Sequence, residues 1–233
     1  MRKTIVTVIA VFCSLLAAFS VQAQQSTRKP VDIGAVATEA MIMKTDTEDR
    51  YQLALWYPYG LYVESSMMKS KESRADVEKA TAYLKPYITI AVQCSIQKED
   101  GDSVYASESK VLARAVLKDA DGSEILPVVK PPAMVSATVA AIKAIISAEG
   151  DEGSKNMHVL VFPNKGKNGK PLVDENAKSK LTMVLKADGS YKETEFVWNT
   201  PFDSLKSVPP CPNCKEHVSA KWSFCPWCGA KLP

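Results

Sequence analysis

Hydrophobic and polar residues alternate along several short segments of the chain. In YITIAVQCSI, residues 87–96, every second side chain from Ile88 to Ile96 is apolar, and this period of two predicts a half-buried strand. The apolar run MHVLVF, residues 157–162, predicts a further strand. Cys94 falls on the apolar face of the first strand. We expect a buried, unreactive thiol there, because no histidine or basic cluster lies near it in the sequence.

Two other segments repeat with the helical period. Ser73 and Asp76 form a capping box, and apolar residues follow at helical spacing until Pro86 ends the run. A second helix is predicted over residues 133–148, with one apolar face made of Val135, Val139, Ile142 and Ile146.

Two further segments contain dipeptides that are typical of tight turns. Asp121-Gly122 and Asp188-Gly189 each lie between apolar runs, and each pair predicts a hairpin. Many short strands with about two helices predict an α+β domain over residues 30–200, built mainly on antiparallel β-sheet in a sandwich-like arrangement. Residues 201–210 contain three prolines and are expected to link this domain to the C-terminal segment.

The N-terminal residues have the parts of a secretory signal peptide. Arg2 and Lys3 precede an apolar stretch, and Val21 and Ala23 supply the small residues before a cleavage site. Residues 1–23 therefore predict export to the periplasm or beyond the cell. The alternative is an uncleaved membrane anchor, because ~20 apolar residues are enough to span a bilayer.

Charge adds little to this picture. Without residues 1–23, 27 basic and 26 acidic side chains remain, so there is no basic field for nucleic acid or an anionic membrane. We expect neither nucleic-acid binding nor membrane insertion of the cleaved chain.

Four cysteines near the C-terminus are spaced as metal ligands. Cys211, Cys214, Cys225 and Cys228 form a C-x2-C-x10-C-x2-C pattern, in which each pair places two sulfurs on one tight turn. Two such turns supply four thiolates to one tetrahedral zinc ion. Four filled positions leave no site for water or substrate, so the pattern predicts a structural ion rather than a catalytic one.

This segment, residues 211–233, resembles the short C-terminal zinc ribbons written C-P-x-C-G-x…F-C-P-x-C-G-x-x-L, which are found in many bacterial proteins. Phe224, Gly229 and Leu232 match that pattern, whereas Lys215 replaces the usual glycine after the second cysteine. The resemblance covers 23 of the 233 residues. It implies a small zinc ribbon that folds around its metal.

The same cysteines have a redox interpretation. C-P-N-C and C-P-W-C have the spacing of thiol-disulfide active sites, and exported proteins meet an oxidising compartment. A thioredoxin-like motif begins a helix after a strand, however, and the last 23 residues leave no room for that fold. We favour zinc and keep an envelope thiol-disulfide oxidoreductase as the alternative.

Two aromatic groups are candidate contact sites. Trp222 and Trp227 either pack around the zinc or serve as exposed anchors for a partner. Trp56, Tyr57 and Tyr59 belong to a core or rim, or stack on a sugar or a peptide.

The candidate chemistry points away from catalysis. The chain has no G-x-S-x-G elbow, H-E-x-x-H motif or paired-carboxylate motif. We predict an exported, non-enzymatic binding or assembly protein whose zinc ribbon contacts another protein of the cell envelope. A glycan-binding domain near Trp56 is a further alternative.

Overall fold

The computed structural model describes residues 31–148, 150–205, 211–216, 218 and 222–232. The predicted signal peptide, residues 1–23, lies outside the described residues. Within the described chain, none of the helices combines the length and the apolarity needed to cross a bilayer.

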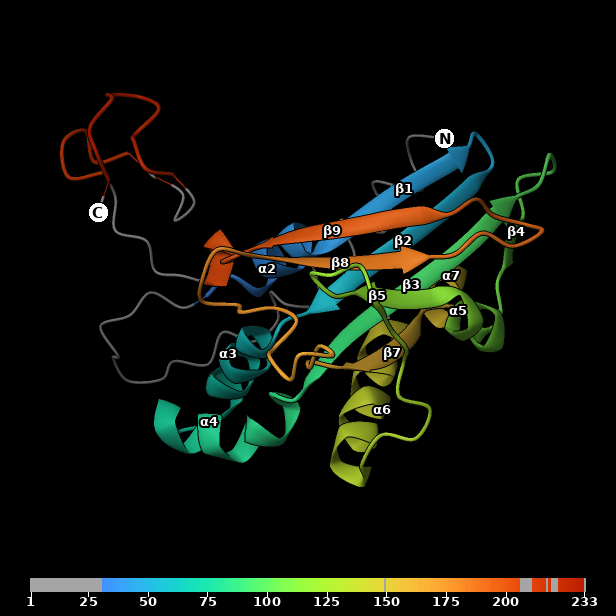
Figure 1. Ribbon diagram of the computed structural model, residues 1–233, viewed down its shortest axis with the longest axis horizontal. Coiled ribbons are helices and arrows are strands. Elements are labelled where there is room, and N and C mark those ends of the chain that lie inside the picture. Colours follow the sequence, from blue (N-terminus) through green and yellow to red (C-terminus); the bar gives the residue numbers. More distant parts are fainter. Residues whose placement is uncertain (1–30, 149, 206–210, 217, 219–221, 233) are drawn as a thin grey trace.

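Two antiparallel sheets form the centre of the domain (Figure 1). The first sheet has the order β1-β2-β3-β4, with β7 also paired to β3; its strands are β1 (Met41–Thr47), β2 (Arg50–Tyr57), β3 (Tyr87–Gln97), β4 (Ser103–Tyr105) and β7 (His158–Pro163). The second sheet has the order β6-β5-β8-β9; its strands are β5 (Ala115–Lys118), β6 (Glu124–Ile125), β8 (Ser179–Leu185) and β9 (Thr194–Thr200). Every pairing is antiparallel.

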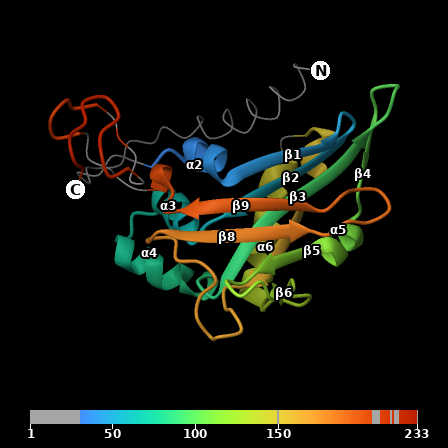
Figure 2. The same ribbon diagram turned by 45° about the horizontal axis from the view of Figure 1, so that its top comes forward.

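Helices surround these sheets. The described residues form α2 (Ile33–Ala40), α3 (Tyr59–Lys69), α4 (Arg74–Thr81), α5 (Glu108–Arg114), α6 (Ala133–Ser147) and α7 (Glu152–Lys155), with 3₁₀ turns η1 (Ala82–Leu84) and η2 (Asp203–Leu205). In Figure 2, the second sheet lies in front of the first, and α6 lies behind. The predicted α+β class is confirmed, and several short helices join the two that the periodicity indicated.

Large aromatic side chains fill the space between the sheets. Trp56 of β2 packs edge-on against Trp198 of β9, with ring centroids 6.0 Å apart, and against Phe202 at 5.1 Å. Trp56, Trp198 and Phe196 are almost completely buried. Aromatic pairs of this kind add to the stabilisation that comes from burial alone.

Both predicted helices form, for the expected reasons. The Ser73 hydroxyl accepts a hydrogen bond from the backbone N–H of Asp76 at 3.3 Å, so Ser73 is the N-cap of α4. In α6, the predicted apolar face is the one that packs inward: Val135, Ile142 and Ile146 are buried, and Val139 is half-buried.

Both predicted hairpins form as well. β5 pairs with β6 around Asp121-Gly122, and Gly122 takes a φ of 81°, which favours glycine. β8 pairs with β9 around Asp188-Gly189. There the Asp188 carboxylate accepts hydrogen bonds from the N–H groups of Ser190 and Tyr191, both at 2.8 Å, and so shapes the turn.

The sequence predicted the position of β3 correctly, but it predicted a half-buried strand where the structure has a largely buried one. Five successive residues, Ile88 to Val92, are buried, so both faces of this part of the strand are covered. β3 is a central strand that pairs with β2 on one side and with β7 and β4 on the other. Its alternation of apolar and polar residues therefore separates two interior faces rather than core from solvent.

The packed part of the chain continues into the expected linker, residues 201–210. Phe202 is buried, and the Glu39 carboxylate accepts hydrogen bonds from the backbone N–H groups of Asp203 at 3.2 Å and Ser204 at 3.1 Å. The first half of this segment therefore packs on the domain, while residues 206–210 lie outside the described chain.

Candidate metal centre

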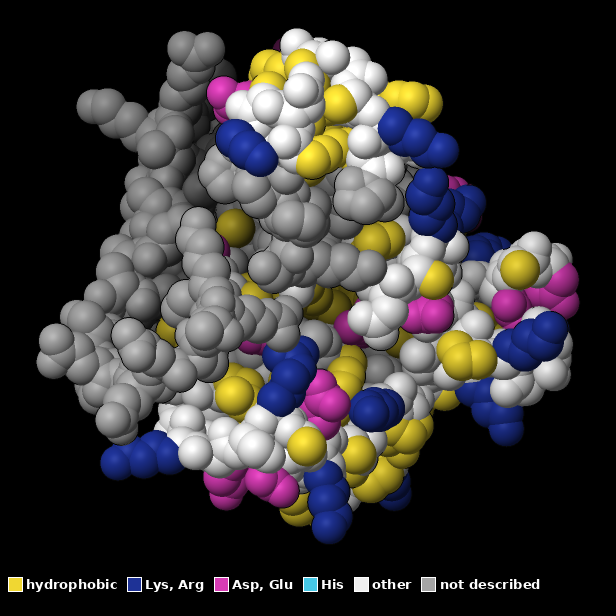
Figure 3. Space-filling view, turned by 90° about the vertical axis from the view of Figure 1, so that its left-hand side faces the viewer, with side chains coloured by type: hydrophobic (Ala, Val, Ile, Leu, Met, Phe, Trp, Pro, Cys, Tyr) yellow, Lys and Arg dark blue, Asp and Glu magenta, His cyan; other side chains and the backbone are white. Residues whose placement is uncertain are grey.

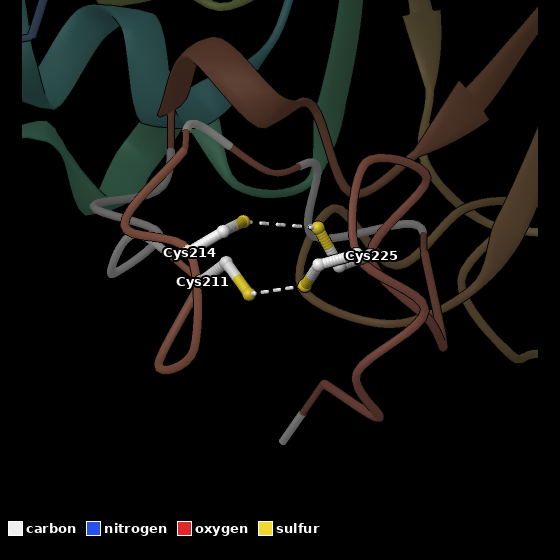
Figure 4. A group of neighbouring side chains, drawn as sticks. Cys211, Cys214 and Cys225 are labelled. Atoms are coloured by element: carbon white, nitrogen blue, oxygen red, sulfur yellow. Dashed lines mark hydrogen bonds between the residues drawn. The ribbon is translucent and has the colours of Figure 1, made fainter.

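The four C-terminal cysteines lie together. The sulfur atoms of Cys211, Cys214, Cys225 and Cys228 all lie within 4.8 Å of one another. Figure 4 shows the turn of Cys211 and Cys214 facing the turn of Cys225. The sulfur of Cys211 lies 3.6 Å from that of Cys228, and the sulfur of Cys214 lies 3.6 Å from that of Cys225. The predicted ligand set is thus brought to one point by two short turns.

The two turns have the same backbone structure. In the first, the N–H of Lys215 donates to the carbonyl of Cys211 at 2.9 Å; in the second, the N–H of Gly229 donates to the carbonyl of Cys225 at 2.8 Å. The N–H groups of Cys211 and Cys225 donate in turn to the carbonyls of Glu216 and Ala230 at 2.9 and 2.8 Å. Each pair of ligands is thus carried by a turn with the same hydrogen-bond pattern.

The spacing fits a tetrahedral metal. Metal–sulfur bonds of ~2.3 Å in a regular tetrahedron separate the sulfurs by about 3.8 Å, which is close to the 3.6 Å seen across both facing pairs. A disulfide bond is far shorter, at ~2.05 Å. All four cysteines are free thiols. The residues present can therefore hold a metal ion through four sulfurs.

Backbone N–H groups prepare some of these sulfurs for metal binding. The N–H of Cys214 lowers the pKa of the Cys211 thiol, and the N–H of Ala230 lowers the pKa of Cys228 to about 6. The pKa of Cys214 behaves differently: the N–H of Glu216 lowers it, but burial and the neighbouring sulfurs raise it to about 12. Because like charges repel, four thiolates at this distance need a cation among them.

A small apolar cluster closes the centre. Cys211, Cys225 and Leu232 are buried, with Val218 and Ala230 packed against them. A metal ion bound by all four sulfurs would have no open coordination position, as is typical of structural sites.

The aromatic residues of the ribbon lie outside this cluster. Trp222 is 42% exposed, Trp227 is 57% exposed and Phe224 is 61% exposed. The two indoles touch edge to face, with centroids 5.5 Å apart. Figure 3 looks onto this end of the molecule, where hydrophobic and basic side chains lie side by side near the top. Among the described residues, the apolar cluster around the sulfurs includes neither indole, and partner contact by Trp222 and Trp227 stays a prediction.

The aromatic stretch of the main domain is divided between core and surface. Trp56 is 1% exposed and serves the core, whereas Tyr57 and Tyr59 are half-buried. The Tyr59 hydroxyl lies 3.0 Å from the carbonyl of Glu78 and 3.0 Å from the Thr81 hydroxyl, so its polar end is bound to α4. Ligand contact by Trp56, Tyr57 and Tyr59 stays a prediction.

A buried polar cluster surrounds Cys94 and was missed from the sequence. Arg114 is only 4% exposed, and its Nη2 donates to Oε1 of the fully buried Gln52 at 2.9 Å, while its Nη1 lies 3.6 Å from the Cys94 sulfur. The sequence around Cys94 has no histidine or basic cluster, so it did not indicate that the single guanidinium of Arg114 lies beside the thiol. The thiol is nevertheless buried as expected, and burial raises its pKa to about 11, although Arg114 lowers it.

Comparisons of the chain with protein-family models, with curated proteins and with solved structures found no match. The fold and the cysteine geometry therefore define the protein: an α+β domain that carries a C-terminal four-cysteine cluster able to hold a metal ion.

Proposed function

We propose that this is an exported, non-enzymatic binding or assembly protein, in which a structural zinc ribbon contacts another protein of the cell envelope. The observation that carries the proposal is the pairing of two equivalent cysteine turns with an exposed Trp222–Trp227 pair. The metal centre would fix the fold of a segment too short for a core of its own, and the indoles would be its contact surface.

Zinc is the ion that the donor set favours. Four thiolates in a tetrahedron suit zinc, which has no geometric preference of its own and no redox chemistry. When bound, the ion would neutralise part of the thiolate charge and hold the two turns together. Cys211 and Cys214 would supply one pair of ligands, and Cys225 and Cys228 the other.

Zinc analysis of the protein purified from its producing cells tests the metal. One zinc per chain, with four thiols becoming reactive when a chelator is added, is the expected result. A Cys211→Ser variant should lose the ion. Metal-free protein with two disulfides would favour the oxidoreductase alternative, which an insulin-reduction assay then checks directly.

Export is tested by measuring the mass of the purified chain, which shows whether residues 1–23 have been removed. The signal-peptide prediction expects a mature chain that begins at Gln24 and fractionates with the envelope or the medium. A full-length chain in the membrane fraction would instead support the uncleaved anchor.

Partner contact is tested by site-specific photocross-linking in the producing cells. A photoreactive residue at position 227 should give one discrete adduct that disappears when Cys211 is replaced by serine, because the ribbon would no longer be folded. The matched control is a photoreactive residue at position 110, which is exposed on α5 in the main domain. Equal labelling from both positions, or none from 227, would contradict the proposal.

A further inference from the structure

Helix α6 is apolar on more faces than the domain covers. Of its fifteen residues, all but Ser136, Thr138, Lys143 and Ser147 are apolar. Its inner face, with Val135, Ile142 and Ile146, packs on the domain. A helix that is apolar all round is normally buried all round. The outer face of α6 is therefore left uncovered by the residues that the structure describes.

This outer face has a defined composition. Met134 is 60% exposed and Ile145 is 59% exposed. Between and beside them, four exposed alanines follow the helical period: Ala137, Ala141, Ala144 and Ala148. Small residues allow a second helix to approach closely, and the larger residues near each end can pack around it. Leu126 at 65% and Val129 at 85% add exposed apolar surface just before the helix.

Charges are absent from the centre of this face and present beyond both of its ends. Lys143, the one charged residue within α6, is half-buried on the flank and is held by Glu108 at 2.8 Å. The exposed Lys130 precedes the helix, and Glu152 follows it, with a side chain 75% exposed whose carboxylate lies 3.8 Å from Nζ of the exposed Lys155. Both positions lie equally far in sequence from Ala141. The outer face is thus apolar in the middle, with an exposed basic residue just before the helix and an exposed acidic residue just after it.

We propose that a second copy of this chain covers the outer face of α6, with the two helices antiparallel and Ala141 near the two-fold axis. In that arrangement Lys130 of each copy lies toward Glu152 of the other, so the same surface complements itself in charge as well as in apolarity. A partner with charged residues along its contact helix would leave them buried without a counter-charge. This inference is independent of the ribbon and of the proposed function.

The contact is expected to be modest in strength. A helix of this length spans about 22 Å, and one helix pair with a few flanking side chains buries less than the ~800 Å² per partner of a standard stable interface. The dimer should therefore dissociate on dilution.

Sedimentation velocity over a range of protein concentrations tests the proposal. The parent protein should convert from monomer to dimer as its concentration rises. Ala141→Glu should raise the dissociation constant by roughly tenfold or more, because it places two like charges beside the axis. Ser136→Glu, on the polar flank of the same helix, is the matched control and should leave the constant unchanged. Thermal unfolding of both variants checks that each is folded.

A charge exchange tests the orientation. Lys130→Glu and Glu152→Lys should each weaken the dimer, and the double variant should restore it; single changes without effect would overturn the antiparallel arrangement. A parent that stays monomeric at every concentration, or a dimer insensitive to Ala141→Glu, would overturn the proposal. Trp227→Ala should not alter the dimer, so failure of the ribbon contact and failure of the α6 contact are distinguishable.

Discussion

Lys215 and Gly229 occupy the same position in the two cysteine turns, and both have positive φ angles, of 63° and 72°. An L-residue pays a steric cost in this conformation, of ~1–2 kcal/mol, that glycine does not. Lys215 compensates in part, because its Nζ donates a hydrogen bond to the carbonyl of Pro212 at 2.9 Å. The departure from the ribbon pattern at position 215 is therefore a change of side chain on an unchanged backbone.

Lys215→Gly should stabilise the metal-bound ribbon. The steric relief exceeds the greater entropy that glycine gives the unfolded chain, and we expect a net gain of roughly 0.5–1 kcal/mol. A zinc competition titration against a chelator of known affinity measures this as tighter binding. Gly229→Ala is the converse change: nothing lies within 4 Å of the added methyl group, so its expected weakening reports the backbone alone. Weaker zinc binding by Lys215→Gly would mean that the lysine hydrogen bond outweighs the backbone cost.

Arg114→Met should destabilise the main domain strongly. Arg114 Nε donates to the Lys186 carbonyl at 2.6 Å, and its guanidinium lies 4.7 Å from the centre of the Tyr191 ring. Methionine fills much of the volume but leaves the Gln52 and Lys186 oxygens without this donor, so a loss of about 3 kcal/mol is expected. Urea denaturation measures it. Lys110→Met, at an exposed position of the same helix, should cost less than about 0.5 kcal/mol. Similar losses from both variants would contradict a special role for Arg114.

The pH dependence of stability should carry a contribution from Glu175. Its carboxylate accepts hydrogen bonds from the N–H groups of Tyr59 at 2.6 Å and Gly60 at 3.0 Å, at the start of α3. Burial raises the pKa of Glu175, although these N–H groups lower it. A carboxyl whose pKa is higher in the folded state stabilises the fold below the unfolded value of 4.5, and this contribution is lost as the pH rises through the folded pKa.

Glu175→Gln should remove that contribution. The free energy of unfolding, measured from about pH 4.5 to about pH 7.5, should fall less with rising pH in this variant than in the parent. The exposed Glu72 provides the control, and Glu72→Gln should keep the parent's slope. A Glu175→Gln slope equal to the parent's would show that Glu175 titrates alike in the folded and unfolded chain.

Features encoded by neighbouring residues were predicted well. The four ligands of the metal centre lie within a span of 18 residues, and the cap of α4 depends on Ser73 and Asp76, three positions apart. In such cases the spacing itself determines which atoms meet. The inner face of α6 was also predictable, because apolar residues that recur at the helical period all lie on the same side of a helix.

Features that depend on distant segments were not predictable in this way. Gln52 and Cys94 are cross-strand partners on β2 and β3, and Arg114 ends helix α5, so the three residues meet only after distant parts of the chain have folded together. No local pattern marks Arg114 as buried, because a single arginine in a short helix normally faces solvent. Likewise, the exposure of Trp222 and Trp227 follows from the cysteines themselves forming the ribbon interior, which composition does not reveal.

Trp198 joins the second sheet to the end of α2. Its indole N–H donates a hydrogen bond to the carbonyl of Ala40, the last residue of α2, at 2.7 Å, and its ring is 2% exposed. Trp198→Phe keeps an aromatic ring but leaves this carbonyl without its donor and opens space in the core. We expect a loss of about 2–4 kcal/mol, since both the hydrogen bond and the packing are affected.

Hydrogen exchange shows whether the bond from Trp198 to Ala40 stabilises α2 specifically, in addition to stabilising the whole domain. In the Trp198→Phe variant, the amides of α2 should exchange faster relative to those of the central strand β3. Trp222→Phe makes the same chemical change at an exposed position and should alter neither the urea midpoint nor the exchange of α2. If α2 and β3 lost protection equally in Trp198→Phe, the indole would act only as a core side chain. The attachment of α2 would then depend on its own packing rather than on the hydrogen bond to Ala40.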